Sequence, residues 1–231
     1  MQSLFRKVKS ILSFLLRFSK NNETLVKVSD FIGLDKKVTK SIFRYELFRT
    51  TLHLNGAILE VGVGSGQGLR MLIRHQEFHR DKREIYAFDS FEGFPKGSKY
   101  DLPNFNAQSK PKYKEFSVSF VKEYLLATGA SKDKVAGVRF IQGYIPDSLQ
   151  KFDGSPIALL NLDLDLYQPT LDSLNYFFKY LLPGGVVLLD DYDGDSAEKK
   201  WPGVKKAVDE FCRINNLILM RGYGDLTYLQ K

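Results

Sequence analysis

The chain has 231 residues, of which 43% are hydrophobic and 26% charged, so it is long enough for one α/β domain and is not a wholly disordered chain. Its single cysteine, Cys212, excludes an intrachain disulfide and a cysteine-based metal cluster, as is typical of a reducing cytosol. The net charge of +7 lies largely toward the N-terminus and predicts no nucleic-acid-binding surface, so we expect a cytoplasmic protein that binds no nucleic acid.

The N-terminal segment Ser3–Lys20 repeats apolar residues at helical spacing with basic residues between them. It is too short and too charged to span a bilayer, and it has no signal-peptide cleavage site. The interpretation we favour is a helix docked on its own domain or on the partner subunit of a homo-oligomer. The alternative is peripheral contact with the inner face of a membrane. We divide the chain into an N-terminal helical extension, residues 1–45, and one domain, residues 46–231.

Within that domain, short apolar runs alternate with helical stretches, a pattern typical of a parallel sheet with helices on both faces. The expected strands are Ala57–Val61, Ile85–Asp89, Val138–Gln142, Ile157–Asp163 and Val186–Asp190. The expected helices are Gly68–His79, Glu115–Thr128, Leu171–Leu182 and Val204–Asn215. Pro183-Gly184-Gly185 marks the passage from the third of these helices to the fifth strand.

The end of the domain differs from this alternation. The runs Leu217–Met220 and Leu226–Leu229 are joined too closely to hold a crossover helix, so we expect an antiparallel hairpin. The predicted fold class is therefore α/β, with a mostly parallel, Rossmann-like sheet that ends in this hairpin. One connection, Phe91–Lys114, has no periodicity and follows the second strand, which places it at the carboxyl edge where such folds bind ligands.

A glycine-rich loop, Gly62–Gly68, follows the first strand and opens a helix. Glycines there allow a tight turn and let backbone N–H groups approach a ligand. The loop lacks the Gly-Lys-Ser/Thr of a phosphate loop and the sixth-position glycine of a dinucleotide loop. An acid followed by Gly-x-Gly-x-Gly is instead typical of S-adenosylmethionine sites. Glu60 would then lie near the methionine end of the donor, and Asp89 would accept hydrogen bonds from the ribose.

Aspartates end the fourth and fifth strands at the same edge: Asp163, Asp190 and Asp191. Crowded carboxylates raise one another's pKa or bind a cation, and a set of oxygen ligands suits Mg²⁺. A substrate hydroxyl on Mg²⁺ loses its proton more readily, and we expect Asp163 to accept that proton before the oxygen attacks a methyl group in line. The alternative is that Asp190 and Asp191 merely cap a loop.

Four stretches resemble the TylF/MycF (macrocin O-methyltransferase) family of Mg²⁺- and S-adenosylmethionine-dependent sugar O-methyltransferases. They are Leu59–Gly68, Asp89–Pro95, Leu162–Tyr167 with Pro183–Gly185, and Asp190–Tyr192. The resemblance implies a class I methyltransferase fold, metal ligands at Asp163, Asp190 and Asp191, and Asp163 as proton acceptor, with Asp165 as a further candidate ligand. The donor-binding residues that it implies are Glu60, Val61, Gly62, Gly64, Ser65, Gly66, Asp89, Ser90, Phe91, Glu92 and Gly93.

The expected function is transfer of a methyl group from S-adenosylmethionine, with the help of Mg²⁺, to a hydroxyl of a sugar. The acceptor would be a sugar-containing small molecule, a glycan or a glycoconjugate. Two alternatives stay open: a catechol or small-phenol O-methyltransferase, and a membrane-associated module that binds S-adenosylmethionine without this activity.

Overall fold

The structure, a computed structural model, describes residues 23–102, 116–193, 201–223 and 226–231. The amphipathic segment Ser3–Lys20 lies outside these residues, so its docking on a subunit or a membrane stays a prediction. None of the helices among the described residues has the length and apolar character needed to cross a membrane.

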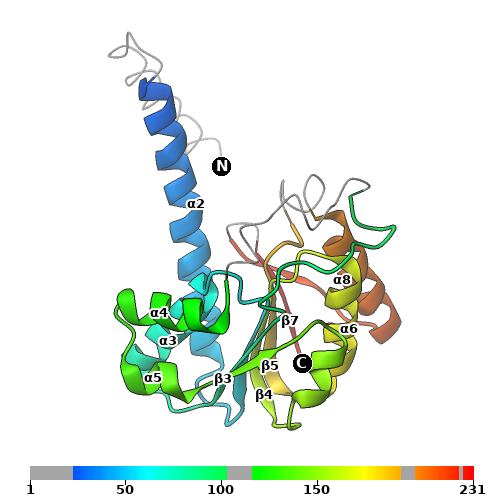
Figure 1. The fold of residues 1–231 in the computed structure, drawn as a ribbon. Coiled ribbons are helices and arrows are strands. Elements are labelled where there is room, and N and C mark those ends of the chain that lie inside the picture. Colours follow the sequence, from blue (N-terminus) through cyan, green and yellow to red (C-terminus); the bar gives the residue numbers. More distant parts are fainter. Residues whose placement is uncertain (1–22, 103–115, 194–200, 224–225) are drawn as a thin grey trace.

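Seven strands of the described chain form one central sheet in the order β3-β2-β1-β4-β5-β7-β6 (Figure 1). In chain order they are β1 Ala57–Val61, β2 Ile85–Asp89, β3 Val138–Gln142, β4 Ile157–Leu162, β5 Leu181–Leu189, β6 Met220–Arg221 and β7 Thr227–Gln230. The first five strands pair in parallel, whereas β7 is antiparallel to both β5 and β6. The predicted α/β class, with a mostly parallel sheet and a C-terminal antiparallel hairpin, is confirmed.

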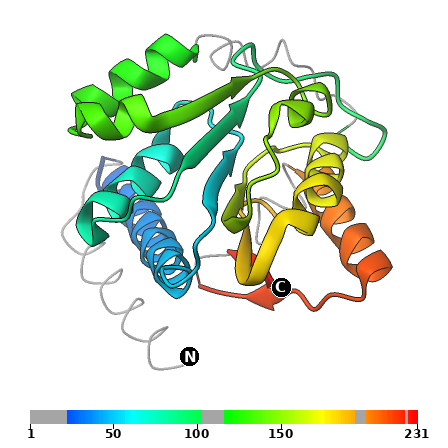
Figure 2. The ribbon, with the colours of Figure 1, turned by 90° about the horizontal axis from the view of Figure 1, so that it is seen from below.

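Helices cover both faces of the sheet (Figures 1 and 2). One layer comprises α2 Glu23–Thr50, α3 Gln67–His79, α4 Val118–Ala127 and α5 Lys132–Gly137. The other comprises α6 Tyr167–Phe177, α8 Pro202–Asn215 and the short 3-10 helices η3 Asp147–Lys151 and η4 Phe178–Tyr180. Side chains alternate along each strand, so Leu59 and Val61 pack with α6 and α8, while Ile58 packs with α2 and α3.

Several element boundaries differ from the prediction, among them the start of β6 at Met220 rather than Leu217, and two differences concern the site. Helix α6 begins at Tyr167 rather than Leu171, because Pro169 is tolerated in a first turn whose N–H groups need no intrahelical partner. Strand β5 begins at Leu181 rather than Val186, and the register with β4 shifts between these two positions. Pro183-Gly184-Gly185 therefore lies in an irregular part of β5 and does not separate a helix from a strand.

Helix α2 continues to Thr50, past the end of the predicted extension at residue 45, and its N-terminal part stands away from the rest of the domain (Figure 1). The predicted boundary between residues 45 and 46 falls inside this helix. Phe43, Leu47 and Phe48 on its last turns are buried in the core, so these turns belong structurally to the sheet domain.

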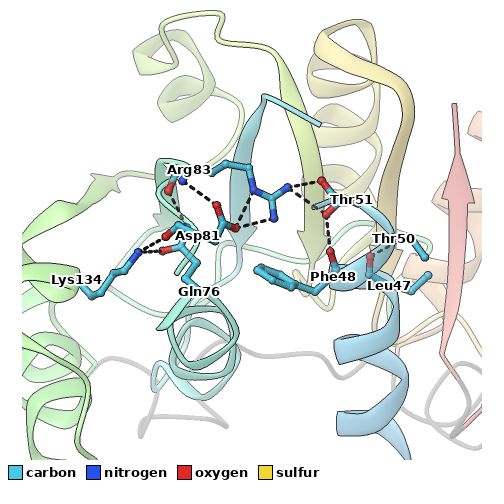
Figure 3. Close-up of polar contacts among 8 residues, drawn as sticks. All are labelled: Leu47, Phe48, Thr50, Thr51, Gln76, Asp81, Arg83 and Lys134. Atoms are coloured by element: carbon cyan, nitrogen blue, oxygen red, sulfur yellow. Dashed lines mark hydrogen bonds and ion pairs between the residues drawn. The ribbon is translucent and has the colours of Figure 1, made fainter. Parts of the chain in front are cut away.

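A polar network fixes the end of α2 to the start of β2 (Figure 3). Arg83 Nη1 donates to the Thr51 carbonyl at 2.8 Å, and Arg83 Nε donates to Asp81 Oδ2 at 2.8 Å. Lys134 Nζ donates to the Asp81 carbonyl, and Gln76 Nε2 donates to the Arg83 carbonyl at 2.7 Å. Helices α2, α3 and α5 are thereby joined at one end of the sheet.

Replacing Arg83 by Met should lower the free energy of unfolding by about 3 kcal/mol or more, because Asp81 would remain buried without its guanidinium partner. The two side chains are only 8% and 7% exposed. Urea unfolding followed by circular dichroism measures the change. Arg139→Met removes a half-exposed ion pair with Glu84 and should have little effect. Equal stabilities of the two variants would show that the Arg83 network does not hold α2.

Candidate functional site

The site is built where β1, β2, β4 and β5 end, at the carboxyl edge of the parallel sheet. Backbone hydrogen bonds continue past the strand ends: Gly62 N donates to Phe88 O at 2.8 Å, and Asp163 N donates to Val61 O at 2.9 Å. Asp190 N likewise donates to Leu162 O at 3.2 Å. The glycine loop and the aspartates therefore meet at one edge, as predicted.

Gly62 lies directly against the backbone that carries Asp163. Its φ is +95°, and a Cβ atom there would lie 1.9 Å from the Asp163 carbonyl oxygen. Only glycine fits both the conformation and the space. The glycine loop and the first residue of the acidic cluster are thus held together by backbone contact.

Asp89 fastens the glycine loop from the β2 side. Its Oδ2 accepts hydrogen bonds from Val63 N at 2.8 Å and Gly64 N at 2.9 Å. Its Oδ1 accepts from Phe91 N at 2.8 Å, and Ser90 Oγ donates to the Gly93 carbonyl at 2.6 Å. The predicted donor-binding stretches on either side of Asp89 are therefore one connected structure. The role of Asp89 toward a ribose stays a prediction.

Glu60 is buried beneath the first turn of α3 rather than facing solvent. Asn161 Nδ2 donates to its Oε2 at 2.8 Å, and a Cβ atom on Gly68 would lie 2.0 Å from its Oε1. Burial raises the pKa of Glu60 to about 7, against the opposing effects of Asn161 and Arg44. Glu60 therefore holds a proton in a large fraction of molecules near neutral pH.

Three carboxylates converge beside the glycine loop: those of Asp163, Asp165 and Asp191, with one oxygen of each within 4.8 Å of the others. The sequence predicted that Asp163, Asp190 and Asp191 lie together. The structure brings Asp163 and Asp191 together, and Asp165 joins them because its φ of +65° turns the chain sharply after β4. Asp190 differs, because its Oδ1 accepts hydrogen bonds from Arg44 Nη2 at 2.7 Å and from Lys40 Nζ at 3.2 Å.

Alternation of side chains explains why the two neighbouring aspartates differ. Leu188 packs in the layer that contains α2, whereas Leu189 packs in the layer of α6 and α8. Asp190 and Asp191 continue this alternation just past the end of β5. Asp190 therefore faces the cations of α2, and Asp191 faces the acidic cluster.

Burial and mutual repulsion dominate the electrostatics of these acids. The pKa of Asp163 lies well above its usual range because of burial and the charges of Asp190 and Asp191. Burial also raises the pKa of Asp191. The pKa of Asp190 is lowered despite burial, because Arg44 and Lys40 stabilise its charge. Three crowded carboxylate oxygens fit a hard divalent cation, which would remove the repulsion among them.

Asp101, a buried carboxylate in the connection after β2, could not be recognised as a site residue from the sequence. Its Oδ1 accepts a hydrogen bond from Tyr167 N, the first residue of α6, at 2.9 Å. A Cβ atom on Gly203, near the start of α8, would lie 2.0 Å from the same oxygen. Since Tyr167 follows Asp165 by two residues, Asp101 ties the connection to the acidic cluster. Carboxylates suit helix N-termini because the helix dipole is positive there.

Aromatic contacts fasten the same connection to the far side of the site. Phe94 stacks on Trp201 with ring centroids 5.9 Å apart, and the ring centroids of Tyr100 and Tyr167 lie 4.4 Å apart. The described part, residues 91–102, therefore runs from β2 to the α6–α8 side of the sheet (Figure 1). Tyr192, directly after Asp191, donates to Asp209 Oδ1 on α8 at 2.5 Å and anchors the end of β5.

The sheet order, the glycine loop and the acids at one edge define a class I methyltransferase fold. A family model described as macrocin-O-methyltransferase (TylF) matches residues 49–219. The chain therefore belongs to the TylF family, and the resemblance seen in the sequence is confirmed.

Curated relatives match part of their length. The chain is 31% identical to the mycinamicin III 3''-O-methyltransferase of Micromonospora griseorubida, over 59% of this chain and 55% of that protein. It is also 31% identical to the 8-demethyl-8-(2,3-dimethoxy-alpha-L-rhamnosyl)-tetracenomycin-C 4'-O-methyltransferase of Streptomyces olivaceus, over 61% of this chain and 54% of that protein. The chain thus spans about half the length of these relatives.

Solved structures of similar fold cover more of the chain. The calicheamicin methyltransferase CalS11 superposes with a TM-score of 0.69 at 26% identity, covering 97% of this chain and 91% of that one. The O-methyltransferase NovP superposes with a TM-score of 0.62 at 23% identity, covering 81% of this chain and 79% of that one. These likenesses agree with the fold assigned from the strand order.

Replacing Glu60 by Gln should flatten the dependence of stability on pH. The folded-state pKa of about 7 lies above the usual glutamate value of 4.5, so the protonated form favours folding. This contribution is complete below pH 4.5 and is lost as the pH rises through 7. The wild type should therefore lose up to about 3 kcal/mol more than Glu60→Gln between pH 4.5 and 7.5.

Urea unfolding at several pH values, with chelator present, measures this difference. Glu77→Gln is the matched control, because Glu77 lies on the surface of α3 with a lowered pKa and does not titrate in this window. It should follow the wild-type curve. Parallel curves for wild type and Glu60→Gln would show that Glu60 is ionised throughout.

Proposed function

We propose that this protein is an S-adenosylmethionine-dependent O-methyltransferase that methylates a sugar hydroxyl with the help of Mg²⁺. The observation that carries the proposal is the contact of the glycine loop with the acidic cluster: Gly62 packs on the Asp163 backbone, beside Asp165 and Asp191. Membership of the TylF family and the names of the sugar O-methyltransferases among its relatives support this proposal.

The donor would lie on the glycine loop and the turn that follows β2. Helix α3 has Gly66 as its N-cap, a residue with no side chain to cover the first turn, so its N–H groups can receive an anionic carboxylate. A Cβ atom on Gly64 would meet nothing within 4 Å, which leaves the loop open. Bound S-adenosylmethionine supplies a sulfonium-activated methyl group to an attacking oxygen.

The acids would hold Mg²⁺ and receive the proton of the acceptor. Asp163 and Asp191 are the candidate ligands that the sequence predicts and that lie together, and Asp165 lies within reach of both. Bound Mg²⁺ would lower the pKa of a coordinated hydroxyl. Asp163 would accept the hydroxyl proton while the new oxygen–carbon bond forms and the sulfur–carbon bond of the donor breaks.

The acceptor would enter from the side formed by residues 91–102 and the starts of α6 and α8. Asp101 and the Phe94–Trp201 stack hold these segments around the cluster. A sugar with two neighbouring hydroxyls could offer both oxygens to the cation. The names of the relatives favour a sugar over a catechol, which has the same pair of oxygens.

Replacing Asp163 by Asn should lower kcat by about 100-fold or more, because the variant lacks both the proton acceptor and one charge at the metal. Methyl transfer from labelled S-adenosylmethionine to a panel of sugars, sugar nucleotides and catechols measures the rate. Chelation with EDTA should abolish transfer, and added Mg²⁺ should restore it.

Asp172→Asn, on the outer part of α6, is the matched control and should keep wild-type turnover. Full turnover of Asp163→Asn, or activity that is indifferent to exhaustive chelation, would remove the metal-assisted mechanism. Transfer to catechols but to no sugar would replace the acceptor class and leave the methyltransferase assignment in place.

A further inference from the structure

We propose that Arg44 of α2 is a positioning residue that draws the charge of Asp190 away from the acidic cluster, and thereby keeps a cation there weakly held and strongly polarising. This inference rests on the proposed function, because it concerns the Mg²⁺ that Asp163 and Asp191 would bind. Helix α2 would then influence the reaction, although it lies outside the glycine loop and the acidic cluster.

The ion pair between α2 and Asp190 is built into the fold. Arg44 Nη2 lies 2.7 Å and Lys40 Nζ 3.2 Å from the same oxygen, Asp190 Oδ1. The two cations are four residues apart on α2 and so share one face of the helix. The side chains of Arg44 and Asp190 are each 17% exposed, which distinguishes this pair from a mobile surface contact.

Neighbouring core contacts fix α2 in the position that the ion pair requires. Phe43, next to Arg44, is buried, and a Cβ atom on Gly222 would lie 2.1 Å from its ring. Leu47 and Phe48 are buried one turn further on. The backbone at Arg44 therefore has little freedom to move, and its guanidinium stays opposite Asp190.

The charge of Arg44 reaches beyond its direct partner. Although burial lowers the pKa of Arg44, the charges of Asp190, Glu60 and Asp163 raise it above its usual value. The same guanidinium acts on Asp163, where it opposes the effect of the surrounding acids. Arg44 is thus an electrostatic neighbour of the whole cluster and not of Asp190 alone.

This arrangement affects how a bound cation would act. A carboxylate that already accepts hydrogen bonds from a guanidinium and an ammonium donates less charge to a metal. A cation with fewer negative ligands lowers the pKa of a bound hydroxyl more strongly and keeps coordination positions open. Without Arg44, only Lys40 would pair with Asp190, so Asp190 would add more of its charge to the cluster, tighten cation binding and weaken the activation of the acceptor.

A purely structural role predicts a different outcome. If Arg44 only anchored α2, its loss would lower stability and leave the affinity for Mg²⁺ unchanged or weaker. The proposed role predicts that affinity and turnover move in opposite directions. Measuring the two together therefore separates the roles.

The experiment uses the full chain and titrates Mg²⁺ alone by calorimetry, with kcat measured in parallel at saturating Mg²⁺. Arg44→Met should bind Mg²⁺ at least fivefold more tightly and turn over at least tenfold more slowly. Arg44→Lys, which keeps the positive charge, should restore most of the wild-type values. Arg74→Met on the surface of α3 makes the same change in net charge away from the site and should alter neither quantity.

Asp190→Asn tests whether the effect passes through Asp190. In that background, Arg44→Met should tighten Mg²⁺ binding by less than it does in the wild type, because only the direct effect of the guanidinium on the rest of the cluster remains. If Arg44→Met does not fold, Lys40→Met decides the question: its more exposed ion pair should give a smaller tightening in the same direction.

Unchanged or weaker Mg²⁺ binding by the folded Arg44→Met or Lys40→Met protein overturns the inference while the proposed function stands. A wild-type chain that binds no Mg²⁺, and whose activity ignores chelators, overturns the metal-assisted function itself. The two failures are therefore distinguishable.

Discussion

Repulsion among carboxylates governs the carboxyl edge of this protein. Parallel strands end side by side, so the acids that follow β4 and β5 are brought together whatever their charges. The surrounding structure limits the repulsion in two ways: Asn161 donates to Glu60, and α2 supplies Arg44 and Lys40. Repulsion remains among Asp163, Asp165 and Asp191, whose carboxylate oxygens lie close enough together for one divalent cation to fit among them.

The parts of the site also restrain one another mechanically. Asp89 fixes the glycine loop, the glycine loop packs on the backbone of Asp163, and Asp101 caps the helix that begins just after Asp165. A methyl donor and an acceptor held by these parts would have a fixed relation, because no side chain separates the loop from the end of β4. Such fixed geometry suits an in-line displacement, whose rate depends on the alignment of three atoms.

Local pattern was sufficient to predict the first four strands, the glycine loop and the meeting of Asp163 with Asp191, because parallel strand ends share an edge. Contacts between distant segments could not be predicted in this way. Nothing in the sequence near Asp190 reveals its partner Arg44, which precedes it by 146 residues, and Asp101 lies in a stretch without periodicity. The early start of α6 was missed because Pro169 reads as a helix breaker unless its place in the first turn is known.

The backbone contact at Gly62 has a consequence for how this scaffold can diversify. Because position 62 accepts no side chain, substitutions there cannot adjust the glycine loop or the acidic cluster, and sequence variation must accumulate at other positions. The connection after β2 is held in place at Phe94 and Asp101. The residues between these two positions can therefore be substituted while the glycine loop and the acids keep their positions. Laboratory evolution toward new acceptors would accordingly begin with libraries in that connection and keep the glycine loop constant.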